Sequence, residues 1–73
     1  MRWVEIEGKV AGEQSEYYPV QIIVDSIVGI GKSNHGYGTS VFVNAGYGIG
    51  VFVTPEGVES IKRKIRAACE GEA

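Results

Sequence analysis

Two copies of a Gly-Tyr-Gly triplet are the residues of this chain whose chemistry best suits ligand binding. They are Gly36-Tyr37-Gly38 and Gly46-Tyr47-Gly48, and each continues through two residues into Val-Phe-Val. Unshielded backbone amides can donate to phosphate or carboxylate oxygens, and a tyrosine ring can stack on a base. We expect such a site to take a small anionic or nucleotide-like molecule, with Lys32 or Arg66 supplying positive charge. In the alternative interpretation, the glycines only permit tight turns and the rings pack sideways.

A second segment, Gly29-Ile30-Gly31-Lys32-Ser33, resembles the end of a phosphate-binding P-loop. The complete pattern needs a glycine five positions before Gly31, where this chain has Ser26, and a helix directly after the lysine. The residues that follow are Asn34-His35-Gly36, which are typical of a loop. We therefore expect no nucleotide-hydrolysing P-loop here.

The nucleophiles, acids and bases of the chain show no spacing typical of a catalytic centre. His35 stands in a polar, glycine-flanked loop, and no Ser, Cys or carboxylate has a recognisable catalytic spacing to it. Cys69 falls on the apolar side of the expected helix, where a packed thiol is unreactive. One histidine and one cysteine also cannot complete a structural zinc site. We expect a protein that is not an enzyme and that uses no metal or cofactor.

The basic residues gather near the C-terminus without forming a single face. At helical pitch the basic residues spread around most of the solvent side, whereas nucleic-acid-binding proteins usually concentrate their basic residues on one face. Positive charge in the last turns also suits the negative end of the helix dipole. Nucleic acid is therefore not an expected partner, and RNA contact is the weakest alternative. The cluster consists of Lys62, Arg63, Lys64 and Arg66.

The elements that must position these residues follow from hydrophobic periodicity. Alternation predicts a strand over 1–7, and β-forming residues predict strands over 17–24 and 27–30, with a polar loop or a frayed hairpin over 8–16. A helix over about 55–69 is predicted from Thr54 and Pro55 at its start and from one apolar arc, with the tail 70–73 frayed. The arc consists of Val58, Ile61, Ile65, Ala68 and Cys69, and Glu59 with Arg63 forms an outward pair.

The repeated Val-Phe-Val segments predict a hairpin that turns through Asn44-Ala45-Gly46, with positive φ at Gly46. In that register Phe42 and Phe52 share one face, and Phe42 covers two bare glycines. Both faces then carry apolar side chains, and one helix covers only one of them. The Phe42 and Phe52 face is therefore a predicted subunit interface. The predicted faces are Val41, Val43, Tyr47, Ile49, Val51 and Val53 against Ser40, Phe42, Gly48, Gly50 and Phe52.

Length and charge limit the classes of function. The chain has 73 residues and a net charge of −2, which predicts a single domain over 1–73. A chain of this size buries only roughly 60% of its unfolded surface, and one cysteine forms no internal disulfide, so we expect a homo-oligomer. The negative charge does not attract nucleic acid or anionic membranes, and no window approaches a membrane span. A lone thiol and the lack of a targeting segment favour the cytoplasm.

From Val20 onward the chain resembles the small FlbD-like proteins of bacteria and phages, over roughly the last 50 residues. Their pattern is a short strand ending in Ile-x-x-Ile, a strand, a tight turn, a strand ending in Val, and a Glu-rich amphipathic helix. The resemblance implies a β-hairpin followed by a helix in a non-enzymatic accessory protein, and it transfers no site residues. The matching segments are Ile27-Val28-Gly29-Ile30, Val41-Phe42-Val43-Asn44, Val51-Phe52-Val53 and Pro55-Glu56-Gly57-Val58-Glu59-Ser60-Ile61.

Together these features predict the α+β class: a small antiparallel β-sheet of four to five strands, strongly curved or partly barrel-like, followed by one C-terminal amphipathic helix. The expected function is that of a homo-oligomeric binding protein that sequesters or senses a small anionic or nucleotide-like ligand at a subunit interface. The alternative is a protein-interaction adaptor or inhibitor, which contacts its partner through the Phe42 and Phe52 face or the helix; the resemblance to FlbD-like proteins makes a phage-encoded protein one form of this alternative.

Overall fold

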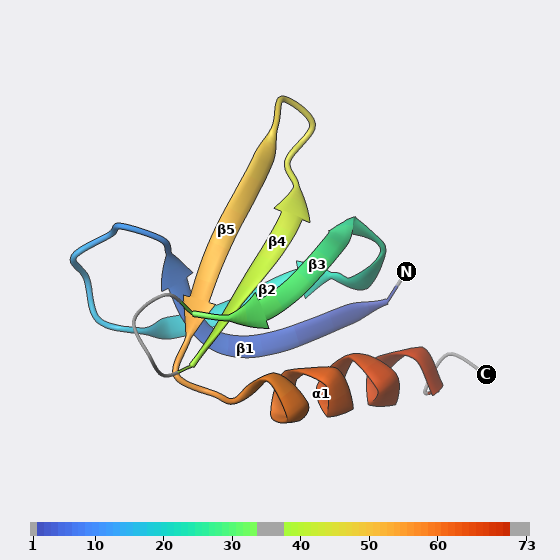
Figure 1. The fold of residues 1–73 in the computed structure, drawn as a ribbon. Helices are drawn as coiled ribbons and strands as arrows, with labels where there is room; N and C mark the ends of the chain where they lie inside the picture. The colour runs from blue at the N-terminus through green and yellow to red at the C-terminus, as the bar shows by residue number, and fades with distance from the viewer. Residues whose placement is uncertain (1, 34–37, 71–73) are drawn as a thin grey trace.

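The computed structural model describes residues 2–33 and 38–70. Over this part of the chain, five strands form one antiparallel sheet in the order β2-β1-β5-β4-β3, and the sheet does not close into a barrel. One helix lies beneath the sheet (Figure 1). This architecture confirms the predicted α+β class. The elements are β1 (Trp3–Val10), β2 (Tyr18–Ile23), the 3-10 turn η1 (Val24–Ser26), β3 (Ile27–Lys32), β4 (Thr39–Asn44), β5 (Ile49–Thr54) and α1 (Val58–Glu70).

Strand β1 follows the predicted alternation but is longer than expected. Val4 and Ile6 are buried, while Glu5 is exposed on the other face. The sequence predicts a loop from residue 8, whereas the strand continues to Val10. Gly8 is accommodated inside the strand because a Cβ at this position would lie only 2.9 Å from the Val53 carbonyl oxygen. The glycine therefore permits close approach of β5 instead of ending the strand.

The β4–β5 hairpin turns one residue later than predicted. Asn44 pairs with Ile49, so the loop has four residues, 45–48, and not the three of Asn44-Ala45-Gly46. The Ala45 amide donates to the Gly48 carbonyl at 2.9 Å, and the Gly46 amide donates to Asn44 Oδ1 at 2.9 Å. Positive φ at Gly46, 88°, is confirmed. Because Asn44 bonds the turn through its side chain, its backbone can still pair with Ile49 as part of the strand.

This register places Phe42 and Phe52 on opposite faces, so the predicted shared face is wrong. Phe42 pairs with Val51, and Phe52 pairs with Val41. The Phe42 ring lies over Gly29 of β3, 3.9 Å from where a Cβ would stand, and not over the glycines of β5. Phe52 packs against the core, and both rings are half-buried. The chain itself therefore covers much of each phenylalanine.

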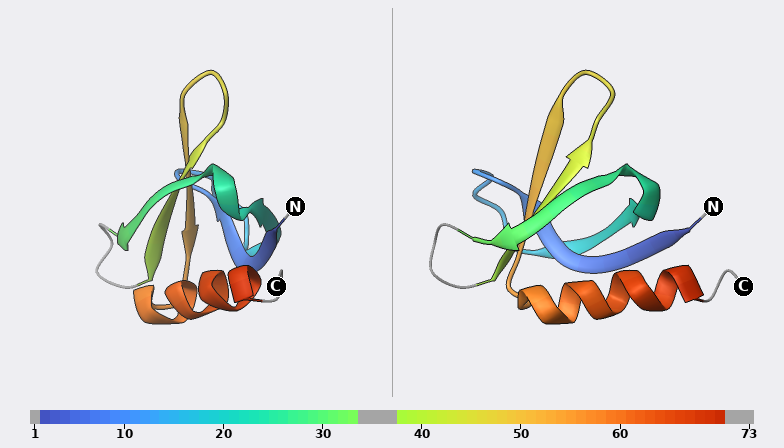
Figure 2. Two further views of the ribbon diagram at one scale, coloured as in Figure 1. Left: turned by 90° about the vertical axis from the view of Figure 1, so that its right-hand side faces the viewer. Right: turned by 45° about the vertical axis from the view of Figure 1, so that its right-hand side comes forward.

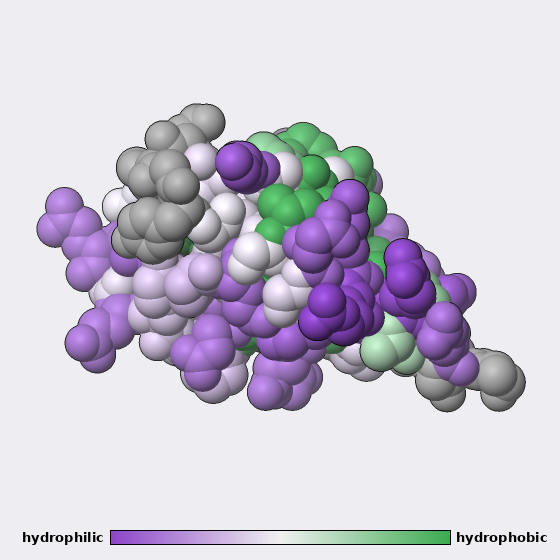
Figure 3. Space-filling model, turned by 60° about the horizontal axis from the view of Figure 1, so that its bottom comes forward, coloured by the Kyte–Doolittle hydropathy of each residue, from purple (hydrophilic) through white to green (hydrophobic). Residues whose placement is uncertain are grey.

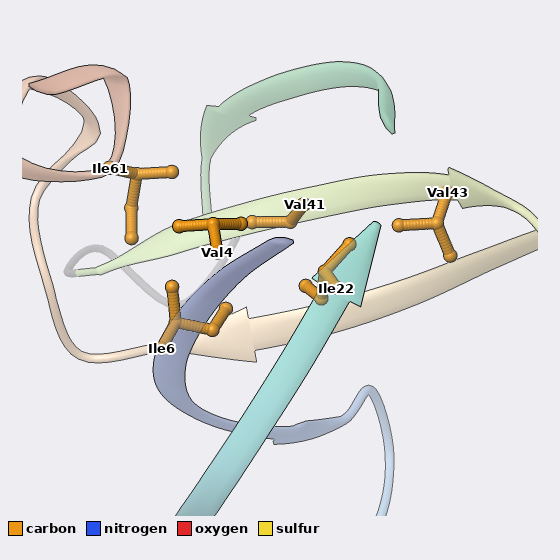
Figure 4. Close-up of a cluster of buried hydrophobic side chains, with 6 residues drawn as sticks. All are labelled: Val4, Ile6, Ile22, Val41, Val43 and Ile61. Carbon is orange, nitrogen blue, oxygen red and sulfur yellow. The ribbon is translucent and has the colours of Figure 1, made fainter. Parts of the chain in front are cut away.

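The core lies between the concave side of the sheet and α1. Six buried side chains from β1, β2, β4 and α1 point toward one another (Figure 4). Ile61 is the helix residue at their centre, 1% exposed, while the other members of the predicted helical arc are half-buried. The predicted apolar arc is thus confirmed. The six are Val4, Ile6, Ile22, Val41, Val43 and Ile61.

Helix α1 begins three residues later than expected. Thr54 is still in β5, paired with Thr39, and so cannot lie at a helix start. The Thr54 hydroxyl instead accepts a bond from the Glu56 amide at 3.3 Å, and the first helical bond runs from the Ile61 amide to the Gly57 carbonyl at 3.1 Å. Strand pairing overrode the capping signal of Thr54 and Pro55.

Candidate functional site

The structure separates the two Gly-Tyr-Gly copies. Gly36 and Tyr37 of the first copy lie outside the described residues. Gly38 stands just before β4, at the end of the hairpin nearest α1, whereas the second copy forms the loop at the opposite end (Figure 1). Within one chain, the described glycine amides of the two copies therefore do not converge on one ligand.

Gly38 has a clear structural role. Its φ is +82°, and a Cβ at this position would overlap the Thr54 carbonyl oxygen. The adjacent Thr39 is fully buried and donates its hydroxyl proton to the Glu56 carbonyl oxygen at 2.7 Å. These contacts tie the start of β4 to the segment that leads into α1. They favour the interpretation of this glycine as a site of close backbone approach.

The two basic residues expected to serve the ligand occupy different elements. Lys32 ends β3 and pairs with Thr39, so it stands beside Gly38. Arg66 is exposed on α1, as are Lys62 and Arg63. The helix surface shows mainly hydrophilic residues, while hydrophobic residues gather beyond it (Figure 3). Neither Lys32 nor Arg66 lies on the elements that form the second Gly-Tyr-Gly copy.

The fourth basic residue, Lys64, belongs to a network at the start of the helix. Its Nζ atom donates to Glu56 Oε2 at 2.8 Å, and the Ser60 hydroxyl donates to Glu56 Oε1 at 2.8 Å. Partial burial raises the pKa of Glu56, but these bonds and the Lys64 charge outweigh it, so the pKa lies below its ordinary value. Lys62 Nζ lies 4.0 Å from Glu59 Oε1, whereas the sequence predicts that Glu59 pairs with Arg63. Lys64 thus bonds the helix to the segment that precedes it, and its charge is paired within the chain.

A hollow of about 230 Å³, whose lining includes Lys9 and Glu13, lies between the β1–β2 loop and the end of β5. Lys9 reaches across it, with Nζ 4.9 Å from the centre of the Tyr17 ring and 3.0 Å from the Ser15 carbonyl that accepts its proton. The Tyr18 hydroxyl donates to Glu13 at 3.0 Å, which lowers the pKa of Glu13 and raises the pKa of Tyr18. The described charges at this hollow are engaged with their own chain.

An apolar hollow of about 260 Å³ lies where β1, β2 and η1 face the β4–β5 hairpin. No charged side chain lines it. Its rim includes Trp3, which is half exposed although it is the largest side chain of the sheet. Sequence analysis missed this residue, because alternation with Val4 shows only that it points away from the core. The apolar lining consists of Trp3, Ile22, Ile23, Val43 and Phe52.

Among residues 2–33 and 38–70, the most exposed large apolar side chains lie at the hairpin tip, which we define as residues 45–49. Tyr47 is 96% exposed and Ile49 is 60% exposed. The tip rises above the other strands and points away from α1 in every view (Figure 1 and Figure 2). The chain carries no Asp, Glu, Lys or Arg from residue 33 to residue 55, so the whole hairpin lacks formal charge.

Residues 2–33 and 38–70 hold no group of three or more His, Cys, Asp or Glu that could bind a metal ion. Within the same residues, no helix has the length and apolar character needed to cross a membrane. Cys69 is a free, half-buried thiol on the inner side of α1.

No family model, curated protein or solved structure matches this chain. The resemblance to FlbD-like proteins therefore stays a prediction. The candidate site has two parts: an uncharged, exposed hairpin tip and an apolar hollow beside the same hairpin.

Proposed function

We propose that this protein works by binding other polypeptide chains, without catalysis, and that the hairpin tip is its contact surface. One observation carries the proposal: Tyr47 and Ile49 stand together at the projecting end of the fold, 96% and 60% exposed. Neighbouring apolar side chains that remain in water mark interaction surfaces more often than scattered ones do. Tyrosine is also enriched at the energetic centres of protein interfaces.

The tip is held in one shape before any partner arrives. The bonds from the Ala45 and Gly46 amides fix the turn, and Gly46 supplies the positive φ that it needs. Little backbone entropy is then lost on binding, which favours affinity from a small contact. The absence of formal charge from the hairpin means that no ion must be desolvated at the contact.

Ligand binding between subunits and a cytoplasmic location stay predictions within this proposal. Gly46, Tyr47 and Gly48 are together at the tip, so an interface built on the tip would bring their amides and ring to any molecule trapped there. Gly38 would have to come from another subunit. The exposed basic residues Lys62, Arg63 and Arg66, which could attract an acidic partner, lie on α1, away from the tip.

Site-specific photo-crosslinking tests the proposal. The photoreactive residue p-benzoylphenylalanine would replace Tyr47 in cells of the source organism, and in a matched control it would replace Gln14, which is exposed in the β1–β2 loop. We expect a discrete covalent adduct with a protein from position 47 that is absent from position 14. The same products from both positions, or none from position 47, would refute a contact at the tip.

A further inference from the structure

We infer that the apolar hollow beside Trp3 receives the Tyr47 ring of a second copy of this chain. In the resulting two-fold dimer, each copy gives one ring and takes one. This inference rests on the proposed function, because it names the partner that the hairpin tip binds.

The hollow suits an aromatic ring. Trp3, Ile23 and Phe52 contribute large apolar surfaces, and none of the lining residues is charged. Its volume of about 260 Å³ lies just below the range of small-molecule pockets and leaves room for one tyrosine side chain. Ser26 lines the same hollow, and its hydroxyl, which donates to the Ile23 carbonyl, can still accept a bond from a phenol hydroxyl. Buried tyrosines usually need such a partner for the hydroxyl.

The chain cannot fill this hollow with its own tip. Val43 and Phe52, which line the hollow, belong to the same two strands that carry the tip away from it. Tyr47 is 96% exposed, so its ring does not lie in the hollow of its own chain. The turn is also fixed by its own hydrogen bonds. A ring in the hollow must therefore come from another molecule.

A second copy of this chain would account for both the exposed Tyr47 ring and the apolar hollow. Closed two-fold dimers use the same patch on both subunits, so the patch must be complementary to itself. Here one hairpin carries a protruding ring at its tip and also lines the hollow, through Val43, Asn44 and Phe52. Both are uncharged, so the net charge of −2 on each chain is not concentrated at the contact.

The area is sufficient for a weak dimer. An aromatic side chain buries about 150–250 Å², so one ring given and one hollow filled would bury roughly 300–500 Å² on each copy. Two copies then bury about 600–1,000 Å², which is the size of weak, transient interfaces. We expect a reversible dimer whose dissociation constant lies in the micromolar range.

Trp3 provides the readout, because it is the only tryptophan of the chain and lines the hollow. The full chain would be diluted while sedimentation velocity follows its mass and fluorescence follows Trp3. We expect dimer formation and a shift of Trp3 emission to shorter wavelength with one common midpoint. Tyr47→Ser should weaken dimerisation at least about tenfold, and Tyr47→Phe should retain it. Circular dichroism checks that both variants fold.

Mixing two variants tests the reciprocal geometry. The Tyr47→Ser chain keeps the hollow and Trp3, whereas the Trp3→Ser chain keeps the ring and is free of tryptophan. Adding the Trp3→Ser chain should therefore shift the emission of the Tyr47→Ser chain. The double variant, Trp3→Ser with Tyr47→Ser, is the matched control and should cause no shift.

Three outcomes would overturn the inference: a monomer at every concentration up to ~1 mM, a dimer that leaves Trp3 emission unchanged, or a dimer that survives Tyr47→Ser. Failure of the proposed function has a different signature. If crosslinking at position 47 captures a different protein, the tip still binds a polypeptide and only the identity of the partner is wrong. If crosslinking captures nothing, both are wrong.

Discussion

Each end of the β4–β5 hairpin contains residues of one Gly-Tyr-Gly copy, and the two ends differ in burial. At the end near α1, Thr39 and Thr54 face each other, 0% and 2% exposed, and Gly38 allows the backbones to touch. At the other end, Gly46 and Tyr47 stand in water. Local composition therefore does not decide what a Gly-Tyr-Gly copy does. Its distance from the core and the helix does, because only buried contacts constrain the side chains.

The largest expected effect is at the buried end, where Ile61 joins α1 to the sheet. Ile61→Ala removes a side chain that is 1% exposed and leaves a cavity between strands and helix. We expect a loss of about 2–5 kcal/mol in the free energy of unfolding, measured by urea denaturation. A loss under about 1 kcal/mol would mean that the helix contributes little to the core.

The second prediction compares glycines from the two ends. Gly38→Ala forces a side chain into the Thr54 carbonyl at positive φ, so we expect a loss of about 2–4 kcal/mol. Gly46→Ala is the matched control: its φ is +88°, but the space around it is open. It should cost about 1 kcal/mol, from backbone strain alone. If thermal or urea unfolding shows equal losses of stability for the two variants, the two ends do not differ in how tightly the backbone is packed.

A smaller effect concerns pH and the Glu56 network. The pKa of Glu56 in the folded chain lies below its ordinary value of 4.5. The stability that this group contributes is therefore complete above pH 4.5 and is lost as pH falls through the folded pKa. The side chain is only 21% exposed, and we expect about 1 kcal/mol.

Glu56→Gln is the matched variant for that measurement. It should reduce stability at pH 7, and its urea midpoint should fall less than that of the parent between pH 6 and pH 3. Parallel pH profiles for the two chains would show that other carboxylates cause the acid sensitivity.

The smallest effect on folding is expected at the tip. Tyr47→Ser changes a side chain that is 96% exposed, so the free energy of unfolding of the monomer should change by less than about 0.5 kcal/mol. The measurement is chemical denaturation at a concentration below the dimer midpoint. A large loss would show that the ring packs on its own chain, and the tip would then cease to be a candidate contact surface.

Several features of the fold were predictable from residue types. The alternation of Val4 and Ile6 against Glu5 indicated a half-buried strand, and the spacing of Ile61 and Ile65 indicated the inner face of the helix. The exposed tip was predictable only in part. Tyr47 was identified as a candidate, whereas Trp3 was not, because an outward position on β1 says nothing of what lies beside it.

The sequence by itself determined the class of fold, the strands, the apolar face of the helix and the glycine turn at residue 46. Only the tertiary structure decided the hairpin register, and with it the opposite faces of Phe42 and Phe52. A register shift by an odd number of residues moves every side chain of a strand to the other face, and Val43 here pairs with Gly50. The Asn44 side chain and the pairing of Thr39 with Thr54 hold the hairpin in this register. The hollow beside Trp3 likewise exists only where three segments distant in sequence meet, so no local pattern could predict it.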